Sequence, residues 1–433
     1  MIKEKYINFV LLLAVISSSI IIPEQLLGRN IFYIYSSVVI IGSFFYFKKL
    51  RITHQDLMLG AAIFLIGASQ LLWSWRFPAH LTEIYRADTN YPKTGTYLII
   101  GSVVISLFPA IMRLSGTGQQ KKTTYYLLFG FITLTLYAVY CKIIAPGERL
   151  RINTSSTLSA ALYTMYSLLT LYSLLCISIP YRKVLASFII FSSLYILILT
   201  ETRSALIVYP VILLYILFNK YAVAKWKALS ICALSFILFS LMIGVFSPNV
   251  YKRASEIITD ITLYQQNNNT SIGARLTMWY SGINEIITHP GGVSAKERYQ
   301  ILADFINKKG NGNPEALRNI PYHLHNDLIE TMSLQGAASG LFLFFFYIAL
   351  IYYMTRKNPS YAALFLCLPV LFFGTVDSLF IHVRFVIMLI GWLIIYTGLT
   401  GALLVEDTPS PPLKKAMKLS NNNRYKKART RAF

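Results

Sequence analysis

The sequence lacks the short motifs with which enzymes and pumps hold nucleotides. It contains no glycine-rich loop of the P-loop or dinucleotide-binding type, no sustained internal repeat, and no Asp-x-Asp pair through which a divalent metal would clamp a nucleotide sugar. These absences argue against a nucleotide-driven pump and against a transferase that uses a metal-bound nucleotide sugar.

Cysteine and charge are also scarce. The four cysteines lie far apart, within or at the ends of apolar segments and without a paired spacing, so we expect free, packed thiols at Cys141, Cys176, Cys232 and Cys367. Only 13% of the residues are charged and 55% are hydrophobic, and the hydrophobic residues form runs long enough to cross a ~30 Å hydrocarbon core. The composition therefore predicts a polytopic membrane protein.

The apolar runs predict an all-α fold with about twelve transmembrane helices. Helices satisfy every backbone polar group in lipid, and the runs lack the alternation of barrel strands. The first run follows Lys3 and Lys5 but has no convincing small-residue cleavage site, so we expect a retained helix. The expected spans are 8–23, 31–47, 58–75, 97–112, 125–145, 157–179, 184–200, 204–219, 228–246, 336–354, 359–376 and 380–404.

The basic residues predict the orientation of these spans. With the N-terminus in the cytoplasm, every loop expected inside carries Lys or Arg, as cytoplasmic loops usually do. This distribution explains the net charge of +22 better than a nucleic-acid-binding patch does. The residues concerned are Lys48, Lys49, Arg51, Arg113, Lys121, Lys122, Arg182, Lys183, Lys220, Lys225, Lys227, Arg356 and Lys357.

The predicted spans divide the chain into four segments. Residues 1–246 contain spans one to nine, 247–335 form a periplasmic helical loop, 336–404 contain the last three spans, and 405–433 form a basic cytoplasmic tail. The tail follows the helix-breaking TPSPPL, and two interpretations stay open: contact with anionic lipid headgroups, or a solvated topology determinant.

Four helices are expected in the periplasmic loop. The first covers VYKRASEIITDITLYQQ, the second GARLTMWYSGINEIIT, the third SAKERYQILADFINKK, and the fourth begins after Pro321 and carries His325. The second is amphipathic and is expected to lie against the membrane surface or to cover a cavity with Leu276, Trp279, Tyr280, Ile283, Ile286 and Ile287.

Three ionisable residues are expected at the periplasmic face: Arg203 in ETRSAL, Arg275 in SIGARLTMW and His325 in HLHNDLIETMSLQG. Arginine offers a fixed charge and planar donors that suit a diphosphate. A neutral imidazole can accept the proton of an attacking hydroxyl, and nearby arginines favour its neutral form. Together the three predict a site that holds a lipid-linked pyrophosphate and activates an incoming hydroxyl.

Each of these residues also has a simpler interpretation. Arg203 could anchor a helix end, Arg275 could lie on a solvated helix face, and His325 could cap or pack. His323 and His325 could bind a metal, although no third ligand is evident from the sequence. Asp377 and Arg384, with His382 between them, could form a structural ion pair.

The motifs ETRSAL, GARLTMW and HLHNDLIETMSLQG, in this order and on these loops, resemble the O-antigen ligase family of Gram-negative bacteria. The family's essential arginines match Arg203 and Arg275, its essential histidine matches His325, and a late acidic residue matches Asp377. In the family pattern the histidine is followed by Asn, nine residues, Gly, and then Gly, Thr or Tyr three positions on. Asn326 and Gly336 fit, but position 339 is Ser and Gly340 comes one step late.

The resemblance implies an inner-membrane glycosyltransferase of GT-C-like fold whose active site faces the periplasm. Its donor would be an O-antigen linked to undecaprenyl pyrophosphate and its acceptor a sugar of lipid A-core, with no metal or other cofactor and with inversion at the anomeric carbon. His325 would be the catalytic base, and Arg203, Arg275, Asn326 and Asp377 would bind substrate. Two alternatives stay open: an O-antigen polymerase with the same donor, and a transporter or flippase of lipid-linked sugars.

Overall fold

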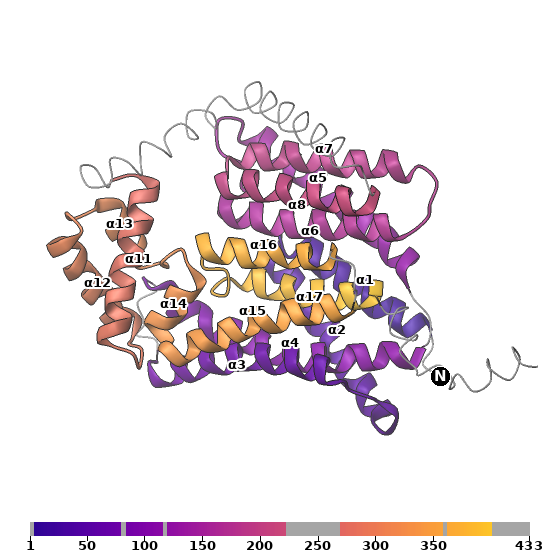
Figure 1. Ribbon diagram of the computed structural model, residues 1–433, viewed down its shortest axis with the longest axis horizontal. Coiled ribbons are helices and arrows are strands. Elements are labelled where there is room, and N and C mark those ends of the chain that lie inside the picture. Colours follow the sequence, from indigo (N-terminus) through magenta and orange to yellow (C-terminus); the bar gives the residue numbers. More distant parts are fainter. Residues whose placement is uncertain (1–3, 79–83, 116–118, 222–268, 358–361, 401–433) are drawn as a thin grey trace, which may run out of the picture.

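The computed structural model describes residues 4–78, 84–115, 119–221, 269–357 and 362–400, and all regular structure among them is helical (Figure 1). This confirms the all-α prediction for the described part of the chain. The long helices are α1 Glu4–Ile20, α2 Gln25–Tyr46, α3 His54–Arg76, α4 Arg86–Ser115, α5 Gln120–Ile144, α6 Ser156–Cys176, α7 Arg182–Thr200, α8 Arg203–Tyr221, α15 Ala337–Lys357, α16 Ala362–Val376 and α17 Val383–Thr400.

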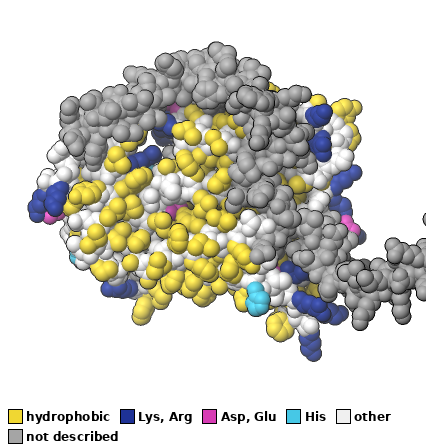
Figure 2. Space-filling view, viewed as in Figure 1, with side chains coloured by type: hydrophobic (Ala, Val, Ile, Leu, Met, Phe, Trp, Pro, Cys, Tyr) yellow, Lys and Arg dark blue, Asp and Glu magenta, His cyan; other side chains and the backbone are white. Residues whose placement is uncertain are grey.

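Eight of the described helices are long and apolar enough to cross a membrane, which supports the prediction of a polytopic membrane protein. They are Gln25–Lys49, His54–Arg76, Arg86–Leu114, Gln120–Ile144, Ser156–Cys176, Arg182–Thr200, Ala337–Thr355 and Val383–Thr400. Two shorter apolar helical stretches, Arg203–Leu214 and Cys367–Val376, lie where spans eight and eleven were expected. The span expected at 228–246 and the tail 405–433 lie outside the described residues. Hydrophobic side chains cover much of the face shown in Figure 2.

Helices α6 and α17 form the centre of the bundle, since nearly all of their residues are buried. Hydroxyl pairs join these helices to their neighbours, which satisfies polar groups that lipid could not. The Tyr163 hydroxyl lies 2.8 Å from Thr135 Oγ1, and the Tyr353 hydroxyl lies 2.9 Å from Thr397 Oγ1. Among the cysteines of the described part, Cys141, Cys176 and Cys367 form no disulfide, as predicted, but Cys176 is exposed rather than packed.

Helices α3 and α4 approach each other closely through glycine. A Cβ at Gly67 would lie 2.9 Å from the carbonyl oxygen of Gly95, so this crossing requires residues without side chains. The contact fixes the end of α3 that lies beside the functional site described below.

Four shorter helices cover one end of the bundle, and we call them the helical cap: α11 Ser271–Thr288, α12 Ala295–Lys309, α13 Pro314–Asn319 and α14 Asp327–Gln335 (Figure 1). Each begins at a side chain that accepts a backbone N–H, as helix starts prefer. The capping residues are Thr270, Ser294, Asn313 and Asn326.

The predictions for the cap need two corrections, and a third prediction is not tested. Helix α14 begins at Asp327, so His325 lies in the loop before it and not on it, because Asn326 is the residue that caps the helix. Helix α13 was not predicted; it is a single short element whose signal is Pro314 directly after a capping asparagine. The helix expected over 250–266 lies outside the described residues.

Helix α11 packs through the face opposite to its exposed apolar residues, so its placement against the membrane surface stays a prediction. Apart from Met278, its buried residues are small or polar, whereas Tyr280, Ile283 and Ile287 are exposed. Small side chains let α14 come close, since a Cβ at Gly282 would lie 2.6 Å from Ile329. The apolar stripe of α11 therefore faces away from the cap.

Candidate active site

His325 occupies a backbone conformation that side-chain-bearing residues rarely adopt. Its φ is +54°, and its N–H donates to Nδ1 of His323 at 3.3 Å. A left-handed non-glycine residue costs of order 1 kcal/mol, so it persists only where the surrounding structure imposes it, and such positions cluster at functional sites. The conformation turns the imidazole toward the bundle.

A buried ion pair fixes the loop that carries His325. Arg298 of α12 and Glu330 of α14 are both almost fully buried, and their Nη1 and Oε1 atoms lie 2.8 Å apart. The other carboxylate oxygen of Glu330 accepts the Leu324 N–H at 2.7 Å, and Arg298 donates to the Ile320 carbonyl at 3.3 Å. Two helices of the cap thus hold both ends of the segment 320–324.

Asn326 joins this loop to the bundle. Its Oδ1 accepts the N–H groups of Leu328 and Ile329, its Nδ2 donates to the Thr375 carbonyl at 3.2 Å, and its own N–H donates to Ser378 Oγ. The side chain that was expected to bind substrate is therefore used to cap α14 and to tie it to the turn after α16. Because Asn326 directly follows His325, these bonds also position the histidine, and substrate binding by Asn326 stays a prediction.

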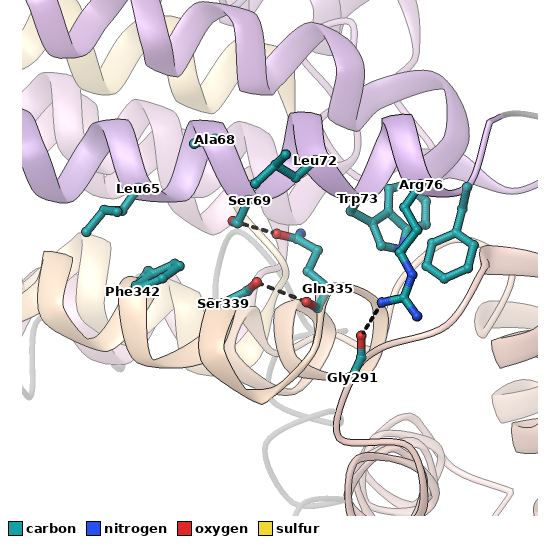
Figure 3. Close-up of a pocket in the computed structure, with 11 residues that line it drawn as sticks. Leu65, Ala68, Ser69, Leu72, Trp73, Arg76, Gly291, Gln335, Ser339 and Phe342 are labelled. Carbon is teal, nitrogen blue, oxygen red and sulfur yellow. Dashed lines mark hydrogen bonds between the residues drawn. The ribbon is translucent and has the colours of Figure 1, made fainter.

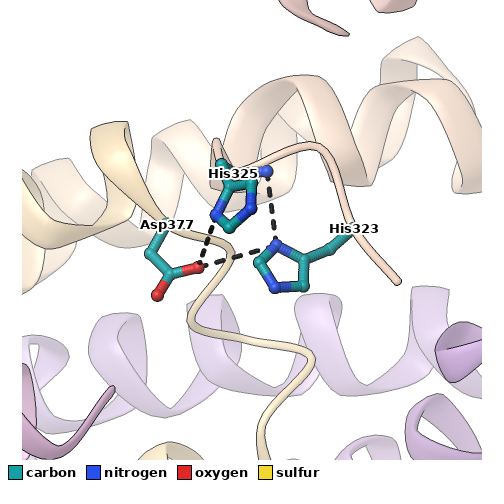
Figure 4. Close-up of side chains that lie close together, drawn as sticks. All are labelled: His323, His325 and Asp377. Carbon is teal, nitrogen blue, oxygen red and sulfur yellow. Dashed lines mark hydrogen bonds and ion pairs between the residues drawn. The ribbon is translucent and has the colours of Figure 1, made fainter. Parts of the chain in front are cut away.

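Asp377 lies in that turn and contacts both histidines (Figure 4). Its Oδ1 is 3.3 Å from Nδ1 of His325 and 3.5 Å from Nδ1 of His323. Nδ1 of His325 has no well-aligned hydrogen bond among the described residues, and a small rotation of the ring would turn the 3.3 Å contact into one. Fifty-two residues of sequence separate the two partners, which the fold brings together.

The cluster combines the carboxylate of Asp377 with the uncharged imidazoles of His323 and His382. Burial alone would raise the pKa of Asp377, but the histidines, led by His325, hold it well below its usual value. Burial lowers the pKa of His323 strongly and that of His382 to about 4, and Arg86 at the start of α4 lowers both further. Asp377 is therefore ionised at neutral pH and both of these imidazoles are uncharged.

Arg203 and Arg275 line one polar cavity of about 380 Å³ together with Arg149. Burial lowers the pKa of the Arg275 guanidinium, Asp377 raises it and Arg203 lowers it, so this arginine is electrostatically coupled to the cavity and to the histidine cluster. We call this hollow the arginine cavity. Its remaining lining residues are Thr157, Glu201, Thr202, Ser204 and Ser271.

Three helices begin at the arginine cavity. Thr157, Arg203 and Ser271 lie in the first turns of α6, α8 and α11. Each helix start presents backbone N–H groups and a partial positive charge, which together with guanidinium groups favours an anion. The hollow is thus suited to a group of high negative charge, such as a diphosphate.

The sequence-based reasoning overlooked Arg149 and Arg86. Arg149 donates to the carbonyls of Thr200 and Glu201, and thereby holds the turn from which α8 and Arg203 start. The sequence did contain an indication that these two arginines matter. Both lie in loops predicted to be periplasmic, where Lys and Arg are depleted. An arginine that departs from this bias calls for a specific role.

A second hollow of about 330 Å³ lies between α3 and α15 (Figure 3). It lies beside the C-terminal end of α11, whereas the arginine cavity lies beside the N-terminal end of that helix. We call it the α3/α15 groove. Its lining residues are Leu65, Ala68, Ser69, Leu72, Trp73, Arg76, Phe77, Gly291, Gln335, Ser339 and Phe342.

The structure changes two of the sequence-based interpretations of the residues around Asp377. Arg384 donates to the Asn153 carbonyl, and no ion pair joins it to Asp377 among the described residues. His323 and His325 do have a third potential metal ligand, because one donor atom from each of them and one from Asp377 lie within 4.8 Å of one another. These three residues form a group that could hold a metal ion.

Glu285 of α11 gives the cap a pH-dependent stability. Both carboxyl oxygens are buried without a hydrogen-bond partner in the described part, and burial raises the pKa to about 8. The folded protein keeps a proton that the unfolded chain releases above a pKa of 4.5. Stability should therefore fall as the pH rises from 5 to 8, by roughly 3 kcal/mol at most.

The Glu285→Gln variant should lose this pH dependence, since an amide cannot ionise. Its Tm should exceed that of the parent at pH 8 and match it more closely at pH 5, and exposed Glu148→Gln serves as the control. An equal difference in Tm at both pH values would show that Glu285 is not the titrating group.

The sequence of this chain is similar to known proteins. Residues 188–345 match the family model described as O-antigen ligase, a range that contains Arg203, Arg275 and His325. Over this range the chain is similar to the O-antigen ligase family, the family that its motifs resemble. It is 27% identical over 330 residues to a protein of Escherichia coli (strain K12) described as O-antigen ligase, and the matched region covers 75% of this chain and 76% of the relative. Asp377 lies outside the residues matched by the family model.

Proposed function

We propose that this protein is an O-antigen ligase, which transfers a glycan from undecaprenyl pyrophosphate to a sugar hydroxyl of lipid A-core. The observation that carries the proposal is the contact of His325 with ionised Asp377 beside a cavity with three arginines and three helix starts. The protein would lie in the bacterial inner membrane with a GT-C-like set of twelve spans, and its helical cap would face the periplasm.

The arginine cavity would hold the diphosphate of the donor, with the isoprenoid tail between helices. Arg203 and Arg275 offer planar donors to its oxygens, and Arg149 adds charge while it fixes the start of α8. When the sugar leaves, negative charge grows on the diphosphate, and preorganised cations stabilise that charge without further rearrangement.

His325 would act as the base. The Nδ1–H of the ring would donate a hydrogen bond to Asp377, which leaves the lone pair on Nε2 free to take the proton of the acceptor hydroxyl. The hydroxyl oxygen then bonds to the anomeric carbon as the bond to the diphosphate oxygen breaks, and undecaprenyl diphosphate departs. A single in-line displacement inverts the anomeric configuration.

The proposed orientation can be tested by cysteine labelling in a background without the native cysteines. Lys296→Cys on α12 and Lys49→Cys, both exposed, lie at opposite ends of the bundle by the charge pattern. A membrane-impermeant maleimide should label the first in intact spheroplasts and the second only in opened membranes. Labelling of both from one side would place the site on the wrong face.

Transfer should survive chelation, because the mechanism uses His325 as a base and routes no step through a metal. Purified protein treated with EDTA should keep its rate once lipopolysaccharide aggregation is controlled for. If activity disappears and a single divalent ion restores it, the cluster of His323, His325 and Asp377 is a catalytic metal site instead.

The function itself is tested by reconstitution. Purified protein, undecaprenyl-pyrophosphate glycan and lipid A-core, without nucleotide, should yield glycosylated lipid A-core. Glycan that lengthens only on undecaprenyl pyrophosphate would identify a polymerase. Movement of the lipid-linked glycan across proteoliposomes without any new glycosidic bond would identify a transporter.

A further inference from the structure

The α3/α15 groove changes character along its length. Leu65 and Phe342 lie at one end, and Trp73, Arg76 and Gly291 lie at the other (Figure 3). Between them Ser69 donates to Gln335 Oε1 at 2.9 Å, which closes the floor of the groove with a polar contact. The groove is therefore apolar in the bundle and polar at the end that carries the helical cap.

Its length matches one leaflet of a membrane. From Leu65 to Arg76 the rise along α3 is about 16 Å, half of a ~30 Å hydrocarbon core. The neighbouring side chains on this surface are exposed and apolar, among them Phe64, Leu72 and Leu341. An acyl chain that enters from the surrounding lipid would fit this depth without meeting a charge.

Polar groups at the capped end suit an anionic headgroup. Arg76 is exposed, and its hydrogen bond to the Gly291 carbonyl at 3.0 Å holds the guanidinium at the rim. Arginine in such a position pairs well with a phosphate. The amide nitrogen of Gln335 is buried below it and makes no well-aligned hydrogen bond within the described part, although the Tyr91 hydroxyl lies near it.

The groove is too far from the arginine cavity to serve the same lipid phosphate. Arg275 in the first turn of α11 lines the cavity, and Gly291, just past the end of that helix, lines the groove. The eighteen residues of α11 span about 27 Å. A lipid whose phosphate contacts Arg76 therefore cannot place that phosphate between Arg203 and Arg275, where the reacting diphosphate would lie.

We infer that the α3/α15 groove binds an acyl chain of the acceptor lipid, with a headgroup phosphate at Arg76. The inference rests on the proposed function. Helix α14 leads from Gln335 in the groove to Asp327, two residues from His325, over about 12 Å. The acceptor's sugars would extend along this helix to the base, while the donor reaches it from the arginine cavity.

Photo-crosslinking tests the binding directly and needs no turnover. A benzophenone amino acid replaces Leu72 in the groove or, as the matched control, Leu136 on α5, whose exposed fractions are 63% and 64%. In phosphatidylethanolamine nanodiscs with purified lipid A-core, the Leu72 position should capture lipid A-core several-fold more than Leu136. Equal capture would mean that only bulk lipid occupies the groove, and the inference would be wrong.

Kinetics separate the acceptor from the donor. Ala68→Trp fills the groove and Arg76→Glu reverses the charge at its rim, so each should raise the KM for lipid A-core about tenfold and change the donor KM less than about twofold. The controls are Leu136→Trp and the exposed Lys296→Glu. An unchanged acceptor KM in correctly folded Arg76→Glu, or an equal rise in both KM values, would overturn the assignment.

The outcomes also separate this inference from the proposed function. If the parent transfers glycan but neither groove variant alters the acceptor KM, the ligase proposal stands and the groove assignment falls. If the parent shows no transfer but Leu72 captures lipid A-core selectively, the binding site stands and the proposed reaction falls.

Discussion

His325→Ala should lower the rate of glycan transfer about 10²–10⁴-fold and leave donor binding largely intact, because it removes the proton acceptor but none of the groups in the arginine cavity. The measurement is single-turnover transfer with saturating donor, together with a separate titration of donor binding. His289→Ala, which alters a histidine just past the end of α11, should transfer at the parental rate.

The membrane level and monodispersity of each variant must first match the parent, since a misfolded protein would give the same loss. If correctly folded His325→Ala transfers at the parental rate, the base assignment is wrong. The left-handed conformation of His325 would then serve only to start α14.

Arg203→Lys and Arg275→Lys should each raise the donor KM about 10–100-fold, with a smaller effect on the acceptor KM. Lysine keeps the charge but loses the planar fork, and a hydrogen bond to a charged group contributes about 1.5–3 kcal/mol. Arg318→Lys on α13, which is exposed and paired with Glu315, is the matched control.

The same assay can contradict the assignment. If both arginine variants keep the parental donor KM and lose affinity for lipid A-core instead, the arginine cavity is the acceptor site. The roles proposed for the cavity and the α3/α15 groove would then be exchanged.

The sequence predicted the helices better than their contacts. Long apolar runs without the alternation of barrel strands can cross lipid only as helices, so the all-helical fold of the described part followed from composition and periodicity. The packed face of α11 did not follow, because the periodicity left open whether the large apolar residues meet the membrane surface or a cavity, whereas close approach to α14 depends on Gly282. Helix α13 is too short to show any period.

Local motifs pointed to Arg203, Arg275 and His325, but not to what surrounds them. The contact of Asp377 with His325 depends on how α16 ends against the cap, which no local pattern encodes. The sequence suggested Arg384 as the partner of Asp377 because the two lie seven residues apart, whereas the fold directs Arg384 to Asn153. Arg149 was missed because its contacts are to backbone carbonyls of a distant turn.

The anomeric configuration of the product tests the central claim most directly. A single displacement, with His325 as base and the diphosphate leaving on the opposite face, predicts that the new bond to lipid A-core has the inverted configuration relative to the donor, as NMR of the isolated product would show. Retention of configuration would require a covalent glycosyl intermediate on the protein and would contradict the mechanism.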